Sequence, residues 1–141
     1  MLDEDFSIAK DQQAAVVSLL CSKLENHQTE EQVNHSLNEM KELLRTLDVP
    51  TVLCEFQRKE HIDPATLLGK GKLEEVGEEA KRRGASLLVF DLELSASQIR
   101  NVKKITGLDV VDRCHVILEI FSQHARTREA RIQIEIARLQ Y

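Results

Sequence analysis

The hydrophobic and polar residues of the chain follow two alternating patterns. Short apolar segments rich in leucine, small and β-branched residues lack strict alternation, which is typical of strands buried on both faces. Between them, apolar residues recur at steps of three and four, so they form one stripe along a helix. The predicted strands are 13–21, 51–57, 87–90 and 110–111. This alternation predicts an α/β fold: a small parallel sheet of about four strands, with helices on both faces and right-handed crossovers.

Capping sequences predict where two of the helices begin. Thr29 and Gln32, and again Ser95 and Gln98, have the spacing of a capping box, in which the two residues satisfy each other's free backbone N–H groups. Pro50 disfavours helical backbone before it, so the first helix should end just ahead of it. We therefore expect helices that follow Thr29 and Ser95.

Another helix is predicted directly after the glycine-containing turn Gly69–Lys72. It would place Glu74 and Glu75 in its first turn and basic residues in its last, an order that suits the helix dipole. The basic residues are Lys81, Arg82 and Arg83. Gly84 follows them and suits the left-handed position that ends many helices.

The last thirty residues, Asp112–Tyr141, pass from an apolar segment through an arginine cluster into a second amphipathic segment. No Gly, Asn or Pro follows, so nothing local ends this element. On a helical wheel the apolar residues of the second segment form two nearly opposite stripes, which predicts two partners. The stripes are Ile132, Ile136 and Leu139, and Ile134, Ala137 and Tyr141. The same residues also alternate with period two, so the local pattern alone leaves a strand open.

The turn of Gly69, Lys70, Gly71 and Lys72 has the composition of a phosphate loop. Two glycines would allow close backbone approach, and the N–H groups of the following helix would face an anion. The turn is not G-x-x-x-x-G-K-[ST], because no Gly stands at the required distance and Leu73 follows the lysine. A tight strand-to-helix turn with solvated lysines explains the same residues.

Two aspartates fall at the carboxyl ends of predicted strands, where sites form in parallel sheets. Asp91 is a candidate for an anion- or nucleotide-binding site, where it could bind a metal or act as a base. Asp112 could do the same, but it is well placed to cap the helix that follows. Cys114 and His115 are adjacent and lack a third group to orient the base, which favours structural roles.

Arginines crowd the beginning of the final segment. Arg126, Arg128 and Arg131 lie within six residues, and Arg138 follows. On a helix, Arg128, Arg131 and Arg138 would lie along one edge, which suits contacts to nucleic-acid phosphates. A solvated helix edge is the alternative.

Composition narrows the class of protein. A length of 141 residues suggests one domain, and the longest apolar runs are too short to span a bilayer. A net charge of −5 argues against the whole surface binding nucleic acid, although a local basic patch remains open. The three cysteines are far apart and lack ligand spacing, so we expect reduced thiols, no metal and a cytosolic location.

Four blocks of sequence resemble the N-terminal region of the HflX family of ribosome-associated GTPases. The blocks are DPATLLGKGKLEEV (63–76), LLVFDLELSASQIRNV (87–102), DVVDR (109–113) and ILEIFSQHARTREARIQIEIARLQY (117–141). They stand in a fixed order through most of residues 50–141, whereas residues 1–49 are similar only in predicted layout. One departure is Lys70, which stands where we would expect serine.

The resemblance implies an α/β domain, then a pair of antiparallel helices, then a Ras-like G domain that binds GTP with magnesium. Residues 1–12 are polar and are expected to be a flexible N-terminus. The resemblance makes 13–125 the α/β domain and 126–141 the start of the helical linker, which favours helix over strand there. We expect no cofactor in this chain and no GTP hydrolysis by it, because it contains no P-loop sequence.

The resemblance also implies a cytoplasmic protein that does not bind a membrane. Its partners would be the RNA of the large ribosomal subunit and its own G domain. The first hypothesis is a ribosome-binding regulatory domain of a protein that splits stalled or hibernating ribosomes. Alternatives are an ATP-binding domain with weak ATPase activity, or a structural module that positions the G domain. The unpaired face of the last helix should meet a second copy of the chain, forming a homodimer, or a folded-back position.

Overall fold

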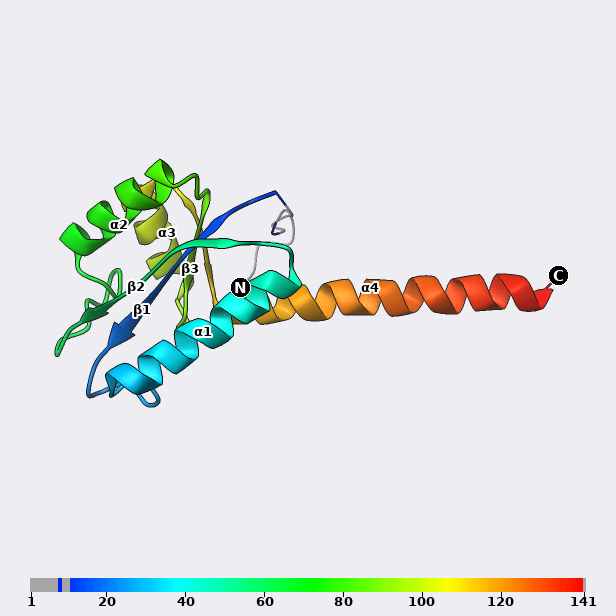
Figure 1. The fold of residues 1–141 in the computed structure, drawn as a ribbon, viewed down its shortest axis with the longest axis horizontal. Coiled ribbons are helices and arrows are strands. Elements are labelled where there is room, and N and C mark those ends of the chain that lie inside the picture. The colour runs from blue at the N-terminus through cyan, green and yellow to red at the C-terminus, as the bar shows by residue number, and fades with distance from the viewer. Residues whose placement is uncertain (1–7, 9–10, 141) are drawn as a thin grey trace.

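The computed structural model describes residue 8 and residues 11–140; for 130, 131 and 133–140 it describes the backbone alone. Strands and helices alternate along the chain, as predicted (Figure 1). The elements are β1 (Ala14–Leu20), α1 (Glu30–Thr46), β2 (Thr51–Arg58), α2 (Lys70–Arg82), β3 (Leu87–Phe90), α3 (Ala96–Thr106), β4 (Asp109–Asp112) and α4 (Arg113–Gln140).

The four strands form one parallel sheet in the order β2-β1-β3-β4. Helices α2 and α3 cover one face of it, and α1 and the first turns of α4 cover the other. The predicted α/β fold with helices on both faces is therefore confirmed. In this strand order, β2 lies on one side of β1, and β3 and β4 follow on the other side of β1.

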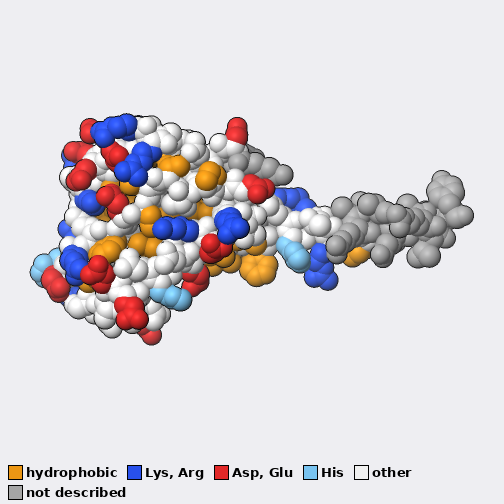
Figure 2. Space-filling view, in the orientation of Figure 1, with side chains coloured by type: hydrophobic (Ala, Val, Ile, Leu, Met, Phe, Trp, Pro, Cys, Tyr) orange, Lys and Arg blue, Asp and Glu red, His pale blue; other side chains and the backbone are white. Residues whose placement is uncertain are grey.

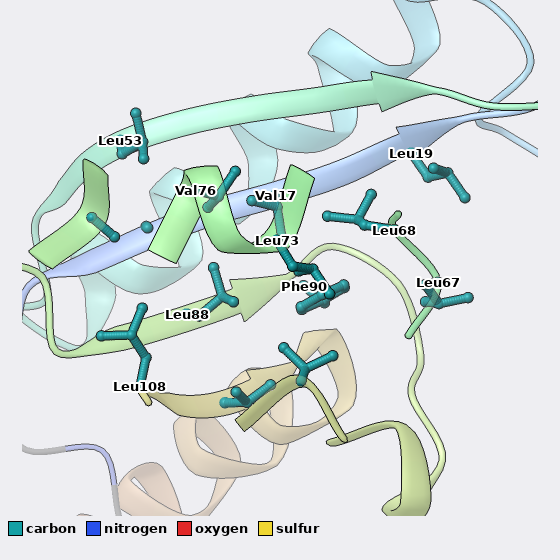
Figure 3. Close-up of a cluster of buried hydrophobic side chains, with 14 of the residues drawn as sticks. Val17, Leu19, Leu53, Leu67, Leu68, Leu73, Val76, Leu88, Phe90 and Leu108 are labelled. Carbon is teal, nitrogen blue, oxygen red and sulfur yellow. The ribbon is translucent and has the colours of Figure 1, made fainter. Parts of the chain in front are cut away.

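Each face of the sheet has its own hydrophobic core. On the α2 side, Val17 and Phe90 of the sheet meet Leu73 and Val76 of α2, and all four are fully buried (Figure 3). On the α1 side, the predicted helical stripe is buried against the strands. Its members are Val33, Leu37, Met40 and Leu44 of α1, with Leu47 directly after the helix.

Both predicted capping boxes are present. Thr29 Oγ1 accepts a hydrogen bond from the backbone N–H of Gln32 at 3.1 Å, and Ser95 Oγ accepts one from Gln98 at 3.2 Å. The reciprocal bonds from the backbone of Thr29 and Ser95 to the two glutamines are also made. The starts of α1 and α3 are thus satisfied within the chain.

The beginning of α2 differs from the prediction. The helix begins at Lys70, so the placement of Glu74 and Glu75 in its first turn is wrong, and that turn contains no acidic residue. The chain reverses earlier than expected, at Leu67, whose backbone has a left-handed φ of 64° and pairs with Asp63. The buried side chain of Leu67 accounts for this early turn, because the core holds it in place.

Helix α4 is continuous over 28 residues and extends far beyond the sheet (Figure 1). This confirms helix for 132–141 as far as Gln140. The predicted boundary between 125 and 126 falls inside α4, and the predicted flexible segment 1–12 lies largely outside the described residues, so the domain division stays a prediction. Among the described residues, no helix is both long enough and apolar enough to cross a membrane.

Candidate functional site

The sheet brings Asp91 to the position where parallel sheets usually carry their sites. Asp91 directly follows β3, and its backbone N–H donates to the Val17 carbonyl of β1 at 2.9 Å. Strand order reverses between β1 and β3, so this point is the topological switch of the fold. The sequence-based expectation that Asp91 lies at a strand end is met.

Asp91 is fully buried and faces two cationic groups. Its Oδ1 accepts hydrogen bonds from Arg113 Nε at 2.9 Å and from Arg113 Nη2, while its Oδ2 lies 3.3 Å from His27 Nε2. Burial alone would raise the pKa of Asp91. The hydrogen bonds from His27 and Ser36 and the charge of Arg113 outweigh that effect and hold the pKa below its ordinary value. The carboxylate is therefore ionised and its charge is compensated.

Arg113 also connects Asp91 to α1. Its Nη1 donates to Glu39 Oε1 at 3.1 Å, and its Nη2 donates to Ser36 Oγ at 2.8 Å. A pocket of about 430 Å³ opens beside these groups, between α1 and the loop that precedes it. The sequence offered one signal for this arrangement: Arg113 begins a helix, where the helix dipole disfavours a cation unless a carboxylate compensates it.

Asp112 performs the capping role that its position predicts. Its Oδ1 accepts a hydrogen bond from the backbone N–H of His115 at 3.0 Å, and its Oδ2 accepts one from Leu94 at 2.9 Å. Burial would raise the pKa of Asp112, but the interaction with the His115 side chain and the two backbone bonds together lower it. The carboxylate thus caps α4 and fixes the loop before α3.

The Gly69–Lys72 segment forms a helix start without a side-chain cap. Gly69 is the N-cap residue of α2 and carries no capping group, in contrast to Thr29, Ser95 and Asp112 at the other three helices. The backbone N–H of Gly69 donates to Gln57 Oε1 at 3.0 Å. No described side chain caps the N–H groups that follow Gly69 in the first turn, which leaves them available to an anion.

The glycines in this segment are not required by the fold. Gly69 has a φ of −61°, which any residue adopts, and Gly71 is not among the positive-φ glycines. A Cβ atom added to Gly71 would meet nothing within 4 Å. By contrast, a Cβ atom on Gly77, in the middle of α2, would lie 3.2 Å from the Cβ of Thr106 in α3, so close helix packing explains that glycine. Glycine at position 71 lowers helix stability without any packing benefit inside the chain, which fits close approach by a molecule outside it.

Lysines surround this helix start. Lys70 is exposed, and Lys72 Nζ lies 3.7 Å from Glu55 Oε2. Lys70 and Lys104 line a shallow pocket of about 400 Å³ between the 63–68 loop and α3. Lys59 Nζ lies 3.7 Å from where a Cβ atom of Gly69 would stand. Lysines of α2 and α3, and Lys59 directly after β2, thus lie near the uncapped end of α2.

The arginines of α4 form a separate candidate region. Arg126 and Arg128 are both exposed, and Arg126 Nη1 donates to Ser122 Oγ at 2.7 Å. The side chains of Arg131 and Arg138 lie outside the described residues. Helix α4 and the start of α2 lie on opposite faces of the sheet, so the structure does not bring the arginines and the glycine turn together. No described contact joins Asp91 to the glycine turn either.

The cysteines and histidines show no metal site among the described residues. All three cysteines are free, and no group of three or more His, Cys, Asp or Glu side chains there is placed to hold a metal ion. Cys114 is exposed, and its neighbour His115 lies with its Nδ1 3.7 Å from Asp112 Oδ1.

The parallel sheet with helices on both faces defines a doubly wound α/β domain, which ends in a long C-terminal helix. The chain belongs to the family described as GTP-binding GTPase N-terminal, whose sequence profile matches residues 34–122. The resemblance to the N-terminal domain of HflX proteins is thereby confirmed.

Individual relatives agree with this assignment. The chain is 43% identical over 112 residues to a GTPase HflX of Lacrimispora saccharolytica, covering 79% of this chain and 26% of that protein. It is 35% identical over 134 residues to the GTPase HflX of Caldanaerobacter subterraneus, covering 95% and 30%. The GTPase HflX of Escherichia coli is 34% identical over 113 residues, covering 80% and 26%. The chain therefore spans less than a third of the length of these relatives.

A solved structure shares the fold. A GTP-binding protein from the archaeon Sulfolobus solfataricus, in complex with GDP, superposes with a TM-score of 0.58 at 22% identity, covering 92% of this chain and 36% of that one. This likeness extends over α4 as well as the sheet, and at this identity it describes the fold alone.

Proposed function

We propose that this chain is the ribosome-binding, regulatory N-terminal domain of an HflX-type GTP-binding protein that acts on the large ribosomal subunit in ribosome splitting and rescue. In this proposal the protein works in the cytoplasm, and a G domain outside these 141 residues binds GTP with magnesium. The family supports the domain type. The uncapped, lysine-surrounded start of α2 is the single observation that carries the binding role.

The start of α2 suits a phosphate of ribosomal RNA. Free backbone N–H groups and the positive end of the helix dipole favour an anion, and Lys70 and Lys72 add positive charge beside them. Gly71 leaves room for a sugar-phosphate backbone to approach the helix closely. Such contacts give affinity without base specificity, and they weaken as salt rises.

The arginines of α4 would supply a second set of phosphate contacts. Arg128 is exposed and makes no hydrogen bond or ion pair with another described residue, so its guanidinium is free to bind a phosphate. Arg131 and Arg138 would extend the set along α4. Because α4 and the start of α2 lie on opposite faces of the sheet, the two regions would contact different parts of the RNA.

Binding of the chain to purified large ribosomal subunits tests this function. The double variant Lys70→Ala with Lys72→Ala should bind more weakly, and the slope of log affinity against log salt should fall by roughly one for each phosphate that the variant no longer neutralises. The matched control is Lys81→Ala with Arg82→Ala, which removes the same charge from the other end of α2. Equal affinity and equal salt slope for the two double variants would rule out the α2 site.

The arginine region has its own test. Replacing Arg126, Arg128 and Arg131 together by alanine should also lower affinity and salt slope. If this triple variant keeps the affinity and the salt slope of the unmodified chain, the arginines have no part in binding. The α2 site is then tested by its own variants alone.

The ATP-binding alternative is less well supported by the geometry. It relies on Asp91 near the glycine turn, but both oxygens of Asp91 face His27 and Arg113. Titration of the chain with ATP and magnesium, followed by calorimetry, decides the matter: heat of binding that depends on Lys72 would restore this alternative.

We also propose that α4 packs against another helical segment, belonging to the G-domain side of the longer protein or to a second copy of the chain. Leu118, Phe121 and Ile132 of α4 are 43%, 67% and 54% exposed. Figure 2 shows hydrophobic side chains on the surface where α4 leaves the sheet. Light scattering of the chain should detect a dimer that Phe121→Ser weakens, and a strict monomer would exclude the homodimer.

A further inference from the structure

A cluster of five side chains, the Asp91 cluster, joins four parts of the fold. We define it as His27, Ser36, Glu39, Asp91 and Arg113. His27 comes from the loop between β1 and α1, Ser36 and Glu39 come from α1, and Arg113 is the first residue of α4. Asp91, at the end of β3, is fully buried at the centre. No role proposed above uses this cluster.

The two partners of His27 favour its imidazolium form. Its Nε2 lies 3.3 Å from Asp91 Oδ2, and its Nδ1 lies 3.3 Å from the backbone carbonyl of Glu25. Both partners only accept hydrogen bonds, so the ring satisfies both when each nitrogen carries a proton. The pKa of His27 is accordingly raised, because the bond to Asp91 outweighs the effect of burial.

The charges of the cluster balance when His27 is protonated. His27 and Arg113 are cationic, and Asp91 and Glu39 are anionic. Loss of the His27 proton leaves a net negative charge in a buried setting and turns a lone pair of Nδ1 toward the Glu25 carbonyl. The Nε2–H group would still donate to Asp91, but Arg113 would be the only cation facing that carboxylate. The hydrogen bond from Nδ1 to the Glu25 carbonyl, which holds the loop, would be lost.

Other charged groups lie near enough to contribute. His35 Nε2, on the exposed side of α1, lies 3.9 Å from Glu39 Oε2. From β2, Cys54 has a thiol whose pKa is raised by burial and, more weakly, by the charge of Asp91. From the start of α4, His115 and Asp112 form a neighbouring pair with Nδ1 and Oδ1 3.7 Å apart.

Helix α4 depends on this cluster because its other attachments are few. Val116 is fully buried against the sheet and Ile120 packs beside that core, but Leu118 and Phe121 already face solvent. Among the described residues, α4 packs against the core through its first turns, where Arg113 and the Asp112 cap supply the polar contacts. A small shift of Arg113 would be magnified along a helix of 28 residues.

The other end of the cluster borders the pocket of about 430 Å³ described above. Asn26, in the same loop as His27, has a left-handed φ of 66° and also lines the pocket. A change in this loop, or a molecule in the pocket, would therefore act directly on His27 and Glu39.

We propose that the Asp91 cluster couples the loop between β1 and α1 to the attachment and direction of α4. The shared carboxylate is the connecting element, since it holds the loop through one oxygen and the helix through the other. Coupling of this kind is reciprocal: a change at either end must be felt at the other.

Hydrogen exchange of the 141-residue chain tests the reciprocity. His27→Gln, which keeps a polar side chain but removes the charge, should speed exchange of the amides of 116–120 in α4 by roughly fivefold or more, the lower range of coupling between sites. Arg113→Gln should speed exchange in the 22–28 loop to a similar degree. His124→Gln, the same replacement at an exposed position of α4, should change neither.

One pattern would overturn the coupling: His27→Gln alters exchange in its own loop alone, and Arg113→Gln alters exchange in α4 alone. A second measurement needs no variant. In an NMR pH titration of the unmodified chain, the amide signals of 113–118 should shift with the same midpoint as the ring nitrogens of His27. Amide signals that stay constant while His27 titrates would equally reject the proposal.

Discussion

Replacement of Asp91 by asparagine provides a quantitative test of the buried cluster. Asp91 is fully buried, and the side chain of Arg113 is 24% exposed, so water does little to screen this pair. Removing one charge of a buried pair typically costs about 3–5 kcal/mol, because the other charge is left uncompensated. Asparagine keeps one oxygen for Arg113, so we expect Asp91→Asn to lower the free energy of unfolding by about 3 kcal/mol, at the low end of that range.

Urea unfolding followed by far-ultraviolet circular dichroism measures this change, since the chain has no tryptophan for fluorescence. A loss of about 3 kcal/mol would lower the midpoint by about 1–3 M urea. The control is Asp109→Asn, the same replacement in an exposed ion pair. Asp109 Oδ1 lies 3.6 Å from Lys103 Nζ, and the side chains of Asp109 and Lys103 are 45% and 62% exposed. It should cost less than about 1 kcal/mol. Equal losses for the two variants would refute the claim that Asp91 is a compensated buried charge.

Two further predictions concern pH and the glycines of α2. The pKa of His27 is raised above its ordinary 6.5, so its contribution to stability is complete below that pH and is lost as pH rises through the folded-state pKa. Urea midpoints of the unmodified chain should therefore fall more steeply above pH 6.5 than those of His27→Gln, and parallel curves would contradict this. Gly71→Ala should stabilise the chain by about 0.5–1 kcal/mol in thermal or urea unfolding, because helix propensity improves without a clash. Gly77→Ala should instead destabilise it, because the new Cβ would press on Thr106; the opposite order of the two glycine variants would show that α2 packs differently.

Local sequence patterns predicted the elements because local physics decides them. Thr29 and Ser95 cap helices through residues three positions away, and Asp112 caps α4 in the same way. The strand at 87–90 needed only a short buried apolar run. Such features require no knowledge of distant residues, so a single sequence is enough to find them.

Features that depend on distant contacts were missed or misplaced. Helix α2 begins earlier than predicted, after a turn in which the buried Leu67 has a left-handed backbone conformation. The neighbouring sequence does not predict this conformation for a leucine. The partners of Asp91 come from positions 64 and 22 residues away, His27 and Arg113. A lone aspartate after a strand indicated a site candidate, but only the fold shows that it is engaged by an arginine.

The central claim, that the start of α2 lies against ribosomal RNA, is tested most directly by site-specific crosslinking. A photoreactive side chain at position 71 faces open space, so it should not disturb the fold. On purified large ribosomal subunits we predict crosslinks to RNA from position 71, and few from the same group at position 81 at the far end of α2. Crosslinks that favour position 81, or that reach only ribosomal protein from position 71, would contradict the account.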